Sequence, residues 1–142
     1  MAVTSTISNH FKFQLVSGNI DLDADTIQMA LVSGEFTFDK DTHATWANVS
    51  SYELPNGVGY ATGGIVMTGV SVEEDDVNDR VNITWDNTRW NASGEFGPII
   101  AGVIYDNTSS DDTILGCIEF GEASLLSSGT YLEVQNVVLR LT

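Results

Sequence analysis

The sequence has very little basic charge and almost no cysteine or proline. Its 142 residues include one cysteine, two prolines, two histidines and five lysines or arginines. The single cysteine, Cys117, excludes a disulfide within the chain, and with two histidines it cannot complete a Cys/His zinc site. Because Cys117 lies in the apolar segment 114–120, we expect a buried core residue rather than a nucleophile.

Long hydrophobic runs are also lacking. No apolar run approaches the roughly 20 residues that a membrane-spanning helix needs. The first residues show neither the basic nor the apolar region of a secretion signal, so we expect no such signal. The chain length and a hydrophobic fraction of 42% fit one domain with a real core. We therefore expect a single domain over residues 1–142, in which residues 1–9 form a flexible N-terminal arm.

Acidic residues are what the sequence has in excess. Twenty aspartates and glutamates give the chain a formal net charge of −15. This charge repels phosphate backbones and anionic lipid surfaces, so we expect no binding to nucleic acid or to a membrane. An acidic chain with few lysines is also typical of proteins that work in high salt, where screening weakens the repulsion. A saline or halophilic setting is therefore one hypothesis.

Short segments with the character of β-strands alternate with turn residues along most of the chain. The patterns predict strands at residues 11–16, 26–32, 64–72, 80–85, 88–92, 99–105, 113–120, 129–135 and 137–141. Residues 99–105 have no polar face, which indicates a central strand. Residues 42–54 show near-helical spacing and predict one short helix. We expect an all-β fold, an antiparallel β-sandwich or jelly roll of about eight strands.

Three aspartates near the N-terminus are candidates for a metal site. Asp21, Asp23 and Asp25 alternate along the chain, and in an extended segment their carboxylates share one face. Calcium prefers such oxygen ligands. The segment does not fit an EF-hand loop, because Thr26 and Val32 stand where that loop has glycine and glutamate. A solvated connection is the simpler interpretation.

A denser acidic group at residues 73–79 is the second candidate, and it includes Asp75, Asp76 and Asp79. Crowded carboxylates either attract a cation such as calcium or extend into water. A third acidic loop lies at residues 106–112. We interpret both segments as solvated loops, with a structural calcium as the alternative.

No residue arrangement typical of catalysis is present. Nucleophilic catalysis needs a base beside the nucleophile, but His10 and His43 have no such partner motif in the sequence. We therefore expect no enzymatic activity and name no catalytic or cofactor-binding residue. Trp46, Trp85 and Trp90 raise one alternative, a calcium-dependent carbohydrate-binding β-sandwich module in which tryptophans stack on sugar rings. Packing of these tryptophans in the core is the simpler interpretation.

An ordered set of short motifs covers nearly the whole chain. In order these are Phe11-Lys-Phe-Gln-Leu, Ile27-Gln-Met-Ala-Leu-Val-Ser, Tyr52-Glu-Leu, Gly59-Tyr-Ala-Thr-Gly-Gly, Val81-Asn-Ile-Thr-Trp, Trp90, Gly97-Pro, Gly102-Val-Ile-Tyr-Asp, Gly116-Cys-Ile-Glu-Phe-Gly and Leu139-Arg-Leu-Thr. With this set the chain resembles a family of small structural proteins of tailed viruses. The resemblance implies a β-domain of the virion without enzymatic activity. The chain departs from typical members in being more acidic, with fewer lysines.

The leading hypothesis from this resemblance is a capsid decoration (cement) protein. Such a protein binds the major capsid protein on the outer surface of the capsid and stabilises the head. We expect a closed homo-oligomer, with a trimer favoured. A tail or neck protein is the alternative within the same class.

Overall fold

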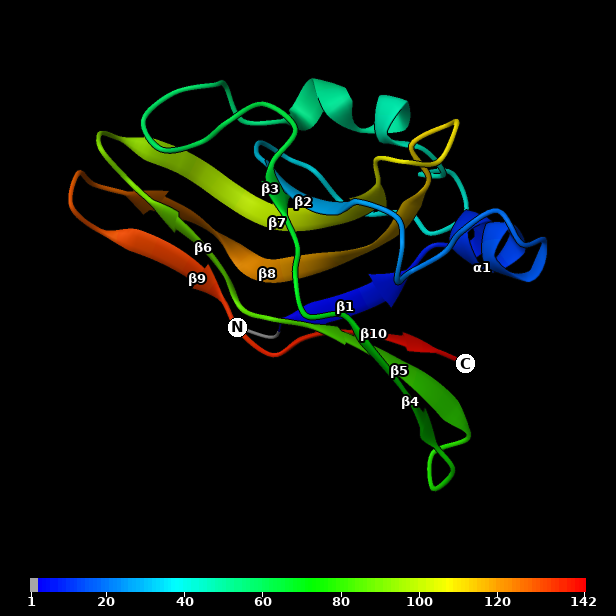
Figure 1. The fold of residues 1–142 in the computed structure, drawn as a ribbon. Coiled ribbons are helices and arrows are strands. Elements are labelled where there is room, and N and C mark those ends of the chain that lie inside the picture. Colours follow the sequence, from blue (N-terminus) through cyan, green and yellow to red (C-terminus); the bar gives the residue numbers. More distant parts are fainter. Residues whose placement is uncertain (1–2) are drawn as a thin grey trace.

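Antiparallel strands are the main secondary structure of the computed structural model, which describes residues 3–142 (Figure 1). The strands are β1 (Thr4–Ile7), β2 (Ile27–Val32), β3 (Ile65–Val66), β4 (Ser71–Asp75), β5 (Arg80–Trp85), β6 (Thr88–Asn91), β7 (Phe96–Asp106), β8 (Ile114–Leu126), β9 (Tyr131–Val134) and β10 (Val137–Leu141). They form a five-stranded sheet in the order β1-β8-β7-β2-β3, a three-stranded sheet in the order β10-β5-β4, and a ribbon of β6 and β9. The expected all-β, sandwich-like fold is confirmed.

The centre of the five-stranded sheet is the strand that the sequence marks most clearly. Strand β7 lies between β8 and β2, so the predicted central position of residues 99–105 is confirmed. Strand β2 shows how both faces of this sheet are buried. Its Met29 and Leu31 belong to one core cluster and its Ala30 and Val32 to the other. Because strand side chains alternate between faces, a run without polar residues requires cover on both sides.

The first core cluster fills the space between the five-stranded sheet and the other strands. There, Ile104 and Ile118 are packed in one cluster with Ile83 and Trp85 of β5 and Leu139 of β10. The opposite face of the sheet is covered by the connection between β2 and β3, which lies above it in Figure 1. The fold therefore has two main layers of strands, and the connection between β2 and β3 covers the outer face of the five-stranded sheet.

Glu53 links the connection between β2 and β3 to the five-stranded sheet through hydrogen bonds. Its Oε2 accepts hydrogen bonds from the Tyr60 hydroxyl at 2.7 Å and from the Gly63 N–H at 2.6 Å. The Tyr60 hydroxyl in turn accepts the N–H of Leu31 in β2 at 3.2 Å. Tyr105 of β7 donates its hydroxyl to the Gly63 carbonyl at 2.6 Å. These bonds satisfy polar groups that the cover would otherwise bury without partners.

The short helix expected near residues 42–54 is present as two consecutive 3₁₀ helices, η1 (Trp46–Asn48) and η2 (Ser50–Tyr52). They lie within the covering connection, and Val49 between them is fully buried. Among residues 3–142, no helix is long and apolar enough to cross a membrane.

The strand predicted at residues 11–16 is wrong, because the segment lies in helix α1 (Asn9–Val16). Helical spacing buries Phe11 and Gln14 together, whereas Phe13 is 64% exposed. Over six residues the apolar pattern fits both a strand and a helix, so packing of Phe11 into the core decides between them. Gly18 follows the helix with φ +79°, a conformation that glycine adopts easily.

The N-terminal segment expected to be a flexible arm is largely part of the fold. Residues Thr4–Ile7 form the edge strand β1, which pairs with β8 from Thr4 opposite Glu119 to Ile7 opposite Gly116. The backbone groups of residues 4–7 thus find hydrogen-bond partners in β8. Residues 1 and 2 of the expected arm lie outside the described residues.

The predicted strand at residues 64–72 is divided between two sheets. Ile65–Val66 pair with β2 in the five-stranded sheet, whereas Ser71–Asp75 pair with β5 in the three-stranded sheet. The chain crosses between the sheets near Gly69, whose φ is +70°. This backbone conformation favours glycine, and a side chain here would also displace the carboxylate of Asp86.

Candidate functional site

The first metal candidate, Asp21, Asp23 and Asp25, stabilises a turn. Oδ1 of Asp21 accepts the N–H groups of Asp23 and Ala24 at 3.1 and 3.2 Å. Oδ2 of Asp25 accepts the N–H of Asp21 at 3.1 Å. The backbone is therefore not the extended chain that would align three carboxylates on one face. Within residues 3–142, no group of three or more His, Cys, Asp or Glu side chains is arranged to hold a metal ion.

The second candidate lies at the turn of the β4–β5 hairpin. Asp75 accepts hydrogen bonds from Asn78 Nδ2 at 2.9 Å and from Arg80 Nε at 2.9 Å. The hydrogen bond from the Asn78 side chain, followed by that from Arg80, lowers the pKa of Asp75 below its usual value. Asp76 and Asp79 are exposed to solvent. Asp75 therefore stabilises the turn, whereas the carboxylates of Asp76 and Asp79 remain hydrated.

Asp106 is the acidic residue that departs most from the expected solvated loop. It ends β7 and is fully buried. Its Oδ1 accepts the N–H groups of Thr108 and Ser109 at 2.9 and 3.0 Å, while no donor among the described residues contacts its buried Oδ2. Burial, together with the neighbouring carboxyl of Asp25, raises the pKa of Asp106 to about 7. Two facing carboxyls can hydrogen bond only by sharing a proton.

The residues considered for catalysis, His10, His43 and Cys117, take part in contacts that stabilise the fold. His10 Nε2 lies 2.8 Å from Asp111 Oδ2, and the pair joins helix α1 to the loop after β7. Cys117 is fully buried in β8, as expected, and burial raises the pKa of its thiol well above the usual value. His43 accepts the N–H of Asp39 on its Nδ1 at 2.9 Å.

The tryptophans are arranged for packing rather than as a platform for sugars. Trp85 and Trp90 are only 6% and 4% exposed and belong to the first core cluster. Trp46 lies on the opposite side of the five-stranded sheet, where its ring stacks on Tyr105 with a centroid distance of 4.9 Å. A sugar-stacking surface needs exposed aromatic faces that lie together, and these three side chains do not provide one.

The β4–β5 hairpin is the most prominent surface element. It extends away from the sandwich at the lower right of Figure 1. Strand β4 is at the end of its sheet, so within residues 3–142 one side of its backbone has no neighbouring strand. Val72 on β4 is 53% exposed and Val77 in the turn is 92% exposed. The hairpin therefore offers apolar side chains and unpaired backbone groups to a partner.

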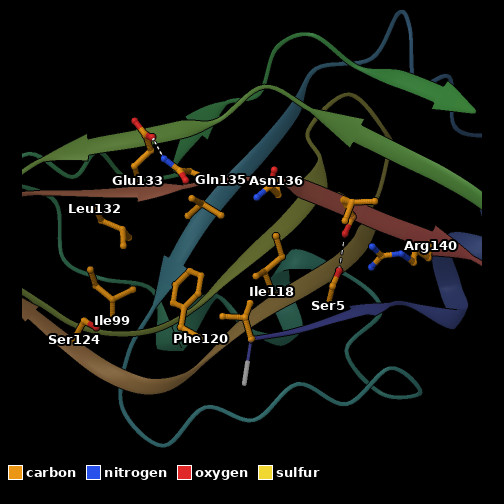
Figure 2. A pocket seen from close by; sticks show the side chains of 13 residues that line it. Ser5, Ile99, Ile118, Phe120, Ser124, Leu132, Glu133, Gln135, Asn136 and Arg140 are labelled. Atoms are coloured by element: carbon orange, nitrogen blue, oxygen red, sulfur yellow. Dashed lines mark hydrogen bonds between the residues drawn. The ribbon is translucent and has the colours of Figure 1, made fainter. Parts of the chain in front are cut away.

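A second surface feature is an apolar pocket of about 480 Å³ between β1 and β8 on one side and the β9–β10 segment on the other (Figure 2). Its apolar wall includes Ile118 and Phe120 from β8 and Leu132 from β9. Arg140 and Ser5 lie on its rim. Because the lining residues come from five strands, no local sequence motif indicates this pocket.

Comparison of the chain with protein-family models, with curated proteins and with solved structures finds no match.

Proposed function

We propose that the chain is a structural protein of a tailed virus, and specifically a capsid decoration protein that binds the major capsid protein on the outer surface of the head. The ordered motifs along the sequence support the viral class. The net charge of −15 supports a position away from the genome, because a strongly acidic surface repels phosphate groups. The same charge fits saline surroundings.

The observation that carries the association role is the projecting β4–β5 hairpin. Its exposed Val72 and Val77 can bury apolar surface only against another molecule. Glu73 and Glu74 lie on the same edge strand. Like charges opposite one another disfavour pairing between two copies of β4. We therefore assign the hairpin to the contact with a capsid subunit and not to the homo-oligomer contact.

In this function the protein works by binding alone. A closed oligomer, with a trimer favoured, places several hairpins against neighbouring capsid subunits at once. Simultaneous contacts hold adjacent subunits together and resist internal pressure. A tail or neck protein of the same viral class uses the same kind of contacts but is present in fewer copies.

Variants of the hairpin test this assignment. Replacing Val72 and Val77 together by serine is expected to weaken binding to particles that lack the protein by roughly tenfold, because two apolar side chains no longer enter the interface. Binding is measured by co-sedimentation of purified protein with such particles. The matched control is Val16→Ser, because Val16 is 88% exposed on α1, away from the hairpin.

Unchanged melting temperatures of both variants verify that the fold is intact. Equal binding of the hairpin variant and the Val16→Ser control would show that the hairpin does not carry the contact.

A further inference from the structure

The pocket between the two layers opens directly onto the hydrophobic core. Ile99 and Ile118, which line it, are members of the first core cluster. Phe120 and Leu132 are partly buried residues packed against the same cluster. Its volume of about 480 Å³ lies within the range of sites that enclose small molecules. A flexible aliphatic chain fits such a lining, because burying each methylene group against apolar side chains is favourable.

Arg140 supplies the charge at the rim of this pocket. Figure 2 shows its guanidinium group turned from β10 towards Ser5. Among residues 3–142, Arg140 forms no ion pair, although the chain has an excess of carboxylates. By contrast, Arg80 is paired with Asp75 at 2.9 Å. A guanidinium without a carboxylate beside an apolar pocket is suited to bind one from a ligand.

The other charged residue of the pocket does not compete for Arg140. Glu133 accepts a hydrogen bond from Gln135 Nε2 at 2.6 Å. Its Oε2 lies 3.8 Å from Nε of Arg89, whose guanidinium is placed over the ring of Tyr131 at 3.5 Å from the centroid. Glu133 thus has its own partners, and Arg140 is the cation left for an incoming anion.

We propose that this pocket binds a small aliphatic carboxylate, with the hydrocarbon chain against Ile118, Phe120 and Leu132 and the carboxylate on the guanidinium of Arg140. The combination of a mainly apolar wall and one charged group at the rim sets both the affinity and the orientation of such a ligand. This inference does not depend on the proposed virion role, since it concerns a different surface from the β4–β5 hairpin.

Decanoate and decanol are the probes, and their binding to the full chain is measured by isothermal titration calorimetry. Decanoate is expected to bind saturably at one site per chain. Arg140→Gln is expected to weaken decanoate binding by about tenfold and to leave decanol binding unchanged, because only the carboxylate uses the charge. Lys12→Gln, the matched control, removes a cation of helix α1 that does not line the pocket and is expected to change neither ligand.

A second variant tests the apolar wall independently of charge. Val138→Trp is expected to fill the pocket and abolish binding of both probes, while the melting temperature shows that the strand is still folded. The proposal is overturned if decanoate does not saturate below the concentration at which it aggregates, or if Arg140→Gln and Lys12→Gln weaken decanoate binding equally. Retained binding in folded Val138→Trp would also overturn it.

Discussion

Phe11→Ala is expected to lower the free energy of unfolding by about 3–5 kcal/mol, whereas Phe13→Ala changes it by no more than about 0.5 kcal/mol. The reason is the helix over residues 9–16. Phe11 is fully buried in the first core cluster, and its removal leaves a cavity that the rigid sandwich cannot fill. Phe13 is 64% exposed, so its loss removes little packing. Urea unfolding of the two variants and the unchanged protein measures the difference.

The pair of variants also distinguishes the two conformations that the local sequence permits. In a strand, Phe11 and Phe13 would lie on the same face and their removal would cost similar amounts of stability. Equal destabilisation would therefore contradict the helix. Because both variants remove the same side chain two positions apart, their difference depends on the environment and not on the chemistry of the substitution.

Asp106→Asn is expected to stabilise the protein at pH 8 by about 2–4 kcal/mol and to flatten the dependence of its stability on pH. The pKa of Asp106 is raised in the folded protein to about 7, above its value of about 4 in an unfolded chain. Between these values the folded protein holds the extra proton, so its stability falls as the pH rises from about 4 to about 7. Above about pH 7 the buried carboxylate is ionised, and the cost of burying its charge lowers the free energy of unfolding by its full amount.

The asparagine side chain suits the site because its oxygen can still accept the N–H groups of Thr108 and Ser109. Its amide nitrogen then takes the place of the buried Oδ2 and donates to the carboxylate of Asp25. Thermal unfolding at several pH values between 4 and 8 provides the measurement. Asp23→Asn is the control, since it removes one negative charge from an exposed position on the same surface. A stabilisation of equal size in both variants would attribute the effect to net charge instead of burial.

A segment of this fold can be predicted from the sequence when its own order of apolar and polar residues shows which of its side chains are buried. Residues 99–105 are apolar at every position, and only a strand covered on both faces accommodates them, so their central position is predictable. Residues 11–16 fit two periods, and the contact that selects the helix comes from the core around Phe11. Residues 4–7 form a strand that pairs with the edge of β8, more than 100 residues away in the sequence. These outcomes depend on distant residues.

The acidic residues and the pocket also differ in how far the local sequence indicates them. The acidic groups are visible in the sequence, but the burial of Asp106 beside Asp25 results from the pairing of β2 with β7, which brings Ile27 opposite Asp106. The turn sequence Asp106-Asn-Thr-Ser is a local signal for a carboxylate that accepts backbone N–H groups. This local signal does not indicate that the carboxyl of Asp25 lies beside Asp106. The apolar pocket is likewise assembled from separate strands.

The number of copies of the chain in purified virus particles tests the virion role most directly. Quantitative mass spectrometry of purified particles, with isotope-labelled peptides of this chain and of the major capsid protein, gives the ratio. The decoration role predicts a copy number comparable to that of the major capsid protein. Absence from the particles, or only a few copies in each, would contradict it.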